Sequence, residues 1–276
     1  MSRAASAWIQ WLARAGYAAR GVVFIVLAYF TAVAAVDAHA RPVDSKDALG
    51  ALLKQPLGGI LLSVITLGLL CFAAWREGQA FLDLDRYGSD LKGLARRSVY
   101  GAAGLFYAAF GTLAFSMILG AHTRATERAV HDWAALLLAE PFGPMLVGAI
   151  GGAIMIAGVC IGVAGVRADF ENRIGLQAKK RRWVTVIGSA GYLTRAAVIF
   201  LIGVFVVFAA LDSNAHEATG LAGALTIIKR QPYGGALLVG AAVGFLAFGV
   251  YGLAEALFRR VDGRSLTAWA PSWMSV

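Results

Sequence analysis

Six long runs along the chain contain no Asp, Glu, Lys or Arg, and they determine its architecture. The runs are Gly21–Val36, Leu57–Trp75, Ser98–Ala121, Phe142–Val166, Ala196–Leu211 and Tyr233–Ala254. A helix of about 20 apolar residues crosses the hydrocarbon core of a bilayer. The apolar positions are continuous rather than alternating, and the runs are too long for the strands of a membrane barrel. The pattern therefore predicts an all-α integral membrane protein with six transmembrane helices.

The first run has an alternative interpretation as a secretory signal peptide, because Ala38-His39-Ala40 resembles a cleavage site. Three features favour a membrane helix instead. The apolar run is long, 20 residues precede it, and a very similar segment recurs at Gly191–Leu211, deep inside the chain. A signal peptide cannot occupy that second position.

The polar positions between the runs repeat three times. Each of the second, fourth and sixth runs opens beside a proline: Pro56, Pro141 and Pro232. The helix before each of them opens with Gly-x-x-x-Arg, at Gly16–Arg20, Gly93–Arg97 and Gly191–Arg195. From glycine to proline the distances are 40, 48 and 41 residues. We therefore predict one membrane domain over residues 1–276, with repeat one at 12–85, repeat two at 89–171, repeat three at 183–260 and a cytoplasmic tail at 261–276.

Each repeat reads as a helix, an outer loop with a short amphipathic segment, and a second helix. The short segments are Asp47–Gln55, Ala129–Glu140 and Leu221–Gln231. They are too short to span a bilayer, so we expect short helices lying at the outer interface. The proline should fall in the first turn of the following helix, where its missing N–H is not needed. Because every unit crosses twice, the copies are parallel repeats, which differ from the inverted repeats of many transporters. The expected arrangement is a pseudo-threefold bundle.

A family resemblance follows from these repeated motifs together with the segment Gly68–Arg76. They resemble the domain-of-unknown-function 1206 family of bacterial membrane proteins, over nearly the whole chain. The resemblance implies three two-helix repeats in a bacterial inner membrane, and it supplies no activity, substrate or catalytic residue. The middle repeat departs from the pattern, since Leu94 replaces a Tyr and Pro144 replaces the second Gly.

Charge distribution predicts which way the chain lies in the membrane. Of its residues 59% are hydrophobic and 15% charged, with a net charge of +9. The two tails and the loops after the second and fourth runs hold 18 Lys/Arg, and the other three loops hold 7. Acidic residues divide eight and eight, so the two sides carry +10 and −1. The positive-inside rule then places both termini in the cytoplasm. We expect the basic loops to face anionic lipid rather than nucleic acid.

Three arginines are the candidate site. Arg20 and Arg195 are each followed by only 16 uncharged residues, about 24 Å of helix, which is less than the ~30 Å core. Arg97 is followed by a run long enough to span. Intramembrane ionisable groups need partners, and Glu77 and Glu255 lie near the inner ends of their helices. The ring of arginines either binds an anion or lipid and gates a central path, or forms structural pairs that fix helix register.

Aromatic residues and glycines complete the membrane pattern. Tyr17, Tyr192, Trp75, Trp183 and Tyr251 lie near the predicted inner boundaries, where an aromatic belt belongs. Glycines at four-residue spacing, Gly148/Gly152, Gly158/Gly162 and Gly240/Gly244, allow helix backbones to approach closely, and we expect them to pack inside the bundle.

Metal, cofactor and enzyme sites are not indicated. All four histidines fall in the outer loops, at His39, His122, His131 and His216, without the ligand spacing of a metal centre. Cys71 and Cys160 lie within predicted helices, so no disulfide framework is expected. No nucleotide loop or catalytic constellation is present. We therefore expect no cofactor and no enzyme.

Two functions remain open at this point. The first is a non-catalytic binding, scaffold or stress-related component of the inner membrane, whose basic face meets anionic lipid or an acidic partner. The second is a small channel or transporter with an axial path and the arginine ring at its inner mouth. The sequence names neither a protein partner nor an oligomeric state.

Overall fold

A computed structural model describes residues 3–37, 39–84, 87–120, 126–168, 178–214 and 217–258. Over these residues the chain is helical and contains no strand. The helices are α1 (Arg3–Val36), α2 (Ser45–Leu53), α3 (Gly58–Phe81), α4 (Leu91–Ile118), α5 (Thr126–Leu138), α6 (Gly143–Arg167), α7 (Ala178–Leu211), α8 (Leu221–Arg230) and α9 (Gly234–Phe258). Six of them, α1, α3, α4, α6, α7 and α9, are long and apolar enough to cross a membrane, as the charge-free runs predict.

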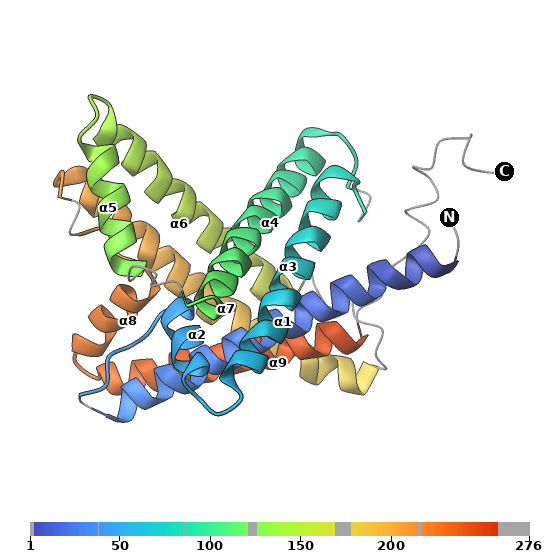
Figure 1. Cartoon of the computed structure of the whole chain (residues 1–276). Helices are drawn as coiled ribbons and strands as arrows, with labels where there is room; N and C mark the ends of the chain where they lie inside the picture. Colours follow the sequence, from blue (N-terminus) through green and yellow to red (C-terminus); the bar gives the residue numbers. More distant parts are fainter. Residues whose placement is uncertain are drawn as a thin grey trace.

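The six long helices pack as pairs that join neighbouring repeats. The second helices of repeats one and two lie along the first helix of the following repeat, in the pairs α3–α4 and α6–α7. The second helix of repeat three lies along the first helix of repeat one, in the pair α9–α1. Within repeats, α1 also packs on α3, and α7 on α9. Over the described residues, α4 and α6 share no extended contact, and in Figure 1 they lean apart as the arms of a V. The bundle is therefore joined through α9 and α1 and splayed at repeat two.

Repeats one and three use the same close approaches between their own two helices. A Cβ added at Gly16 of α1 would lie 2.6 Å from Cα of Phe72 on α3. A Cβ added at Gly191 of α7 would lie 2.6 Å from Cα of Phe248 on α9. In each case only glycine lets the facing helix backbone come this close. These matching contacts show that the outer two repeats share one internal packing.

The contacts between repeats are also related. Gly249 of α9 lies against the α1 backbone near Gly21, and Gly158 of α6 lies against the α7 backbone near Ala196 and Phe200. Of the glycines in the four-residue pairs, Gly158 and Gly244 make close approaches to a neighbouring helix, whereas Gly152 and Gly240 face open space. The glycine spacing thus predicted helix packing, and two of the six positions provide a close approach, while Gly148 and Gly162 are in ordinary contact with α7.

The turn between each short helix and the next long one requires a glycine. A Cβ at Gly58, Gly143 or Gly234 would collide with a carbonyl oxygen in the last turn of the preceding short helix. The long helices begin at these glycines, so Pro56 and Pro232 lie two residues before the helix and not in its first turn. This placement corrects the expectation from the sequence. The residue between the proline and the glycine is Leu57 in repeat one and Tyr233 in repeat three. Both have a left-handed backbone conformation with a φ of 64°.

Two of the short helices are built into the bundle. Leu49 of α2 and Leu225 of α8 are fully buried, and each joins a core formed by the long helices. Helix α2 contacts α1, α3 and α4, whereas α8 contacts α7 and α9. The prediction of three short helices is confirmed. Helices α2 and α8 also insert an apolar face between the long helices, and their position at the outer interface stays a prediction.

Candidate functional site

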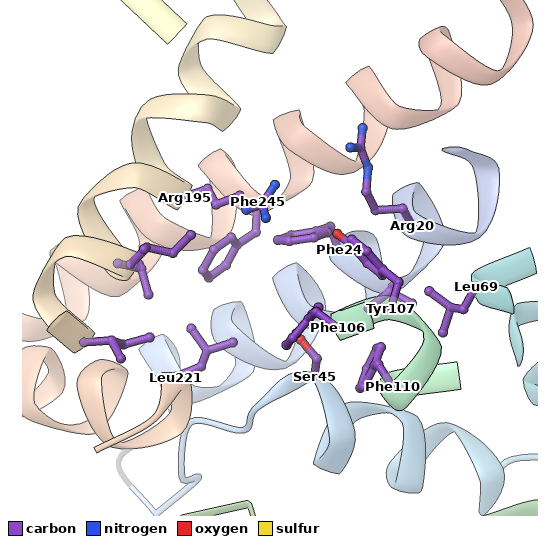
Figure 2. A pocket seen from close by; sticks show the side chains of 14 residues that line it. Arg20, Phe24, Ser45, Leu69, Phe106, Tyr107, Phe110, Arg195, Leu221 and Phe245 are labelled. Carbon is purple, nitrogen blue, oxygen red and sulfur yellow. The ribbon is translucent and has the colours of Figure 1, made fainter. Parts of the chain in front are cut away.

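A cavity lies at the centre of the bundle, where the first and third repeats meet helix α4. Its volume is about 170 Å³. Helices α1, α4 and α7 form most of its wall, and α2, α3, α8 and α9 each add one side chain. Most of the lining is aliphatic or aromatic, and Figure 2 shows the Phe24, Phe106, Phe110 and Phe245 side chains around the space. The charged groups that line it are Arg20 and Arg195.

Arg20 is buried and paired with an acid from the third repeat. Its guanidinium Nη2 donates to Oε2 of Glu255 at 2.5 Å, and the two residues are 2% and 3% exposed. The guanidinium also lies 4.9–5.2 Å from the ring centres of Tyr17, Phe72 and Phe248. Aromatic faces attract a desolvated cation. One carboxylate and three rings thus hold Arg20 where α9 crosses α1.

Arg195 occupies the matching position in repeat three, and its surroundings differ. Its guanidinium lies 5.3 Å from the ring centre of Phe248 and 5.9 Å from that of Phe24. No carboxylate of the described residues forms an ion pair with it, and the side chain is half-buried. The Phe248 ring thus lies between two guanidiniums, of which one is neutralised by Glu255. The cavity retains an excess positive charge at Arg195.

Arg97 does not line the cavity with the other two arginines. Its Nε donates to the carbonyl oxygen of Ala80 at 2.7 Å, and its Nη2 donates to that of Phe81 at 3.1 Å. It therefore satisfies free carbonyls at the C-terminus of α3, where a cation is also favoured by the helix dipole. The structure brings Arg20 and Arg195 to one cavity and places Arg97 elsewhere, so a ring of three arginines does not form.

Glu77 and Glu255 have separate environments. Glu255 holds Arg20, whereas the carboxylate of Glu77 lies directly against Gly104 of α4. Oxygen Oε1 of Glu77 is buried and accepts no hydrogen bond from the described residues. A side chain at position 104 would collide with this carboxylate. Glycine at 104 therefore makes room for the carboxylate at the α3–α4 contact.

Buried aromatic side chains are the part of the site that the sequence reasoning missed. Tyr17, Trp75 and Tyr251 were expected in an interfacial belt, and they are 1%, 3% and 0% exposed. Of the expected belt, Trp183 is exposed, at 68%. Edge-to-face contacts join Tyr17 to Phe72 and Tyr192 to Phe248, with ring centres 5.1 and 5.4 Å apart. The nearly equal spacing of these pairs in repeats one and three, 55 and 56 residues, was the available signal.

The histidines and cysteines form no centre within the described part of the chain. Across those residues no three His, Cys, Asp or Glu side chains lie close enough to hold a metal ion. His39 is exposed, and half-buried His131 lines a separate groove of about 660 Å³ with acidic and basic side chains. His122 and His216 lie outside the described residues. Cys71 and Cys160 are free thiols, as expected.

The two ends of the cavity are lined by different groups. Ser45 of α2 and Leu221 of α8 line the end toward the short helices. At the other end lie Arg20, with its aromatic rings, and Arg195. Helices α4 and α7, on facing walls, share no extended contact over the described residues. Phe106 of α4 lines the cavity and is 63% exposed, so the open side of the cavity lies along α4.

Comparison with known proteins gives one curated relative over nearly the full length. The chain is 30% identical over 260 residues to "Uncharacterized protein YxxB" of Bacillus subtilis (strain 168), and the match covers 92% of each chain. No solved structure matches the chain.

Three tandem segments of the chain, residues 15–83, 99–168 and 190–259, match the family described as Domain of Unknown Function (DUF1206). Arg20 and Arg195 each follow the start of their segment by five positions, whereas Arg97 precedes the second segment. By the same count Gly104, which faces Glu77, stands in the arginine position of repeat two. These three segments confirm the internal repeat, and the chain belongs to the DUF1206 family of multi-pass membrane proteins.

Proposed function

We propose that this protein is a non-catalytic binding protein of the bacterial inner membrane, and that the central cavity is its binding site. The observation that carries the proposal is the pairing of an apolar cavity of about 170 Å³ with one arginine that has no carboxylate partner among the described residues. Cavities of about 150 Å³ lined by apolar side chains already bind benzene-sized molecules. Specific sites combine such walls with a few oriented polar groups.

The orientation in the membrane follows from charge. The basic loops and both termini face the cytoplasm under the positive-inside rule, and the short helices face the outer side. Arg20 and Arg195 then lie toward the cytoplasmic end of the cavity. The basic loops on that side would meet anionic lipid headgroups.

A channel along the bundle axis has less support. Conduction needs a polar path open at both ends. The cavity has apolar walls, helices α2 and α8 cover one end, and Arg97 stays outside it. Reactivity of a cysteine at position 195 toward a charged thiol reagent tests the channel, after Cys71 and Cys160 are replaced by Ala. Reaction with reagent added on either side of the membrane would favour conduction over binding.

Filling the cavity tests the binding proposal directly. Val198 of α7 is 5% exposed and lines the cavity, so Val198→Phe places a ring into the empty space. Val243→Phe on α9 is the matched control, because Val243 is 61% exposed and does not line the cavity. Native mass spectrometry of the full chain released from lipid nanodiscs measures the mass of any non-protein molecule that stays bound.

The expected result is a stoichiometric mass on the wild-type protein and on Val243→Phe that disappears from Val198→Phe. An unoccupied wild-type protein would overturn the proposal. Equal retention by all three proteins would also overturn it, because the bound molecule would then lie outside the cavity. A circular dichroism spectrum of Val198→Phe equal to that of the wild type shows that the loss is not caused by unfolding.

A further inference from the structure

We infer that the cavity takes a single-chain anionic amphiphile, whose acid group pairs with Arg195 and whose chain enters from the bilayer along α4. This inference rests on the proposed binding function and specifies its ligand. The shared chemistry is one acyl chain with one anionic headgroup, as in a fatty acid or a lysophospholipid. Three features of the site indicate such a ligand: a missing carboxylate, the shape of the cavity and its open side.

The missing carboxylate is found by comparing two related helix contacts. Helix α9 packs on α1 through Gly249, and α6 packs on α7 through Gly158. Six positions after Gly249 stands Glu255, which neutralises Arg20. Six positions after Gly158 stands Ala164, on the helix that packs against the one carrying Arg195. Repeat two therefore carries an alanine at the position where repeat three carries the acid that pairs with Arg20.

An unneutralised guanidinium beside a membrane cavity favours an anionic ligand. Ionisable groups within a bilayer are costly unless they are paired. The rings of Phe24 and Phe248 compensate Arg195 in part, because their faces attract the cation. A charge-assisted hydrogen bond to an acid group is stronger than these ring contacts. The acid group of a ligand would complete at Arg195 the pairing that Glu255 provides at Arg20.

The shape of the cavity selects a single chain. Away from the two arginines its walls are apolar, formed by side chains such as Phe110, Ile199 and Ile202. At about 30 Å³ per group of water size, 170 Å³ holds about six such groups. Two acyl chains do not fit this volume, whereas the first part of one chain does. The remainder of that chain leaves through the open side along α4, into the hydrocarbon of the bilayer.

Binding of matched probes tests the inference. The full-length protein is placed in phosphatidylcholine nanodiscs that contain oleate, oleoyl lysophosphatidylglycerol, oleyl alcohol or hexanoate, and native mass spectrometry measures occupancy. Oleate and the lysophospholipid carry both chain and charge, and their relative occupancy distinguishes the two sources. Oleyl alcohol has the chain without the charge, and hexanoate has the charge with a short chain. We expect oleyl alcohol and hexanoate each to bind about ten-fold or more weakly than the preferred anionic amphiphile.

Three variants locate the headgroup. Arg195→Gln should weaken oleate binding about ten-fold or more, and Arg195→Lys should retain part of the affinity because it keeps the charge. Ala164→Glu leaves the arginine in place and supplies the missing carboxylate, so it should also exclude the anion, whereas Ala164→Gln should not. Arg97→Gln is the control for loss of an arginine away from the cavity, and its occupancy should equal that of the wild type.

The other possible results overturn the headgroup contact, the ligand class or the proposed binding function. Equal binding of oleate and oleyl alcohol, or unchanged binding by Arg195→Gln, would remove the assigned headgroup contact. None of the four probes binding, while the wild-type protein retains a mass that is absent from Val198→Phe, would overturn the ligand class. The proposed binding function would remain supported in that case. Failure of the probes together with an empty wild-type protein would overturn both.

Discussion

Substituting Gly191 by Ala tests whether the close helix contacts hold the site together. An ideal Cβ at this position lies 2.5 Å from the backbone N and 2.6 Å from Cα of Phe248. Carbon atoms pack best about 3.5–4.0 Å apart, so α9 must move away by about 1 Å. The obstacle is backbone, which cannot rotate away as a side chain can. Overpacking of this kind costs about 1–3 kcal/mol.

The gain from helix propensity acts in the opposite direction. Alanine is better than glycine in a helix interior by about 0.8–1 kcal/mol. Gly240→Ala isolates that gain, because a Cβ at Gly240 meets no atom within 4 Å. The net effect of Gly191→Ala is thus a loss of up to about 2 kcal/mol, against a gain of up to about 1 kcal/mol for Gly240→Ala.

Thermal unfolding in detergent, followed by circular dichroism, measures the difference. At about 2–4 °C per kcal/mol for a chain of this size, Gly191→Ala should unfold several degrees below Gly240→Ala. Gly16→Ala provides a replicate, because its Cβ meets Phe72 at the same 2.6 Å from Cα. Equal midpoints for Gly191→Ala and Gly240→Ala would refute the reasoning, since the helices would then yield to a methyl group without cost.

Two further predictions concern turns and the buried ion pair. Leu57→Gly should raise the unfolding midpoint, because glycine relieves a left-handed conformation that costs an ordinary residue about 1–2 kcal/mol. Phe142→Gly at the same turn of repeat two has an ordinary φ of −108° and should bring no such gain, and equal midpoint shifts would contradict the strain argument. Replacing Glu255 alone by Met should lower the free energy of unfolding by about 3–5 kcal/mol, because Arg20 stays buried without its acid. The Arg20→Met/Glu255→Met double variant should recover most of that lost stability. A double-mutant cycle by thermal unfolding measures the coupling, and additive losses would show that the pair is not energetically linked.

The membrane helices could be predicted because charge-free runs report directly on the hydrocarbon core. Five of the six long helices exceed their runs in length, and α6 equals its run. Helix α3 was expected at Leu57–Trp75 and extends over Gly58–Phe81, through Arg76 and Glu77. A helix needs its backbone hydrogen bonds inside the bilayer and can continue beyond it, so the first charged residue marks a boundary of the apolar core and not the end of the helix.

The face of each helix that turns inward could not be read in the same way. In a soluble helix the apolar stripe marks the buried side, but a membrane helix is apolar all round. Tyr17 and Tyr251 therefore looked like interfacial anchors, although both are buried inside the bundle. Arg97 was grouped with Arg20 because both end a Gly-x-x-x-Arg motif. The longer spacing in repeat two, 48 residues against 40, indicated that Arg97 lies about two helical turns away from the equivalent position.

Departure from symmetry explains why the two arginines that line the cavity differ in their acidic partners over the described residues. Equivalent repeats would place an arginine, an aromatic pair and an acid at every junction. Repeat three supplies Glu255 to Arg20, whereas repeat two carries Ala164 at the matching position of α6, beside the helix of Arg195. Helix α4 of the same repeat leans away from α6 and lines the cavity with Phe106, Tyr107 and Phe110. The divergent middle repeat thus contributes one wall of the cavity and lacks the acid that would compensate Arg195, and reversing its difference with Ala164→Glu should abolish anion binding while the arginine remains.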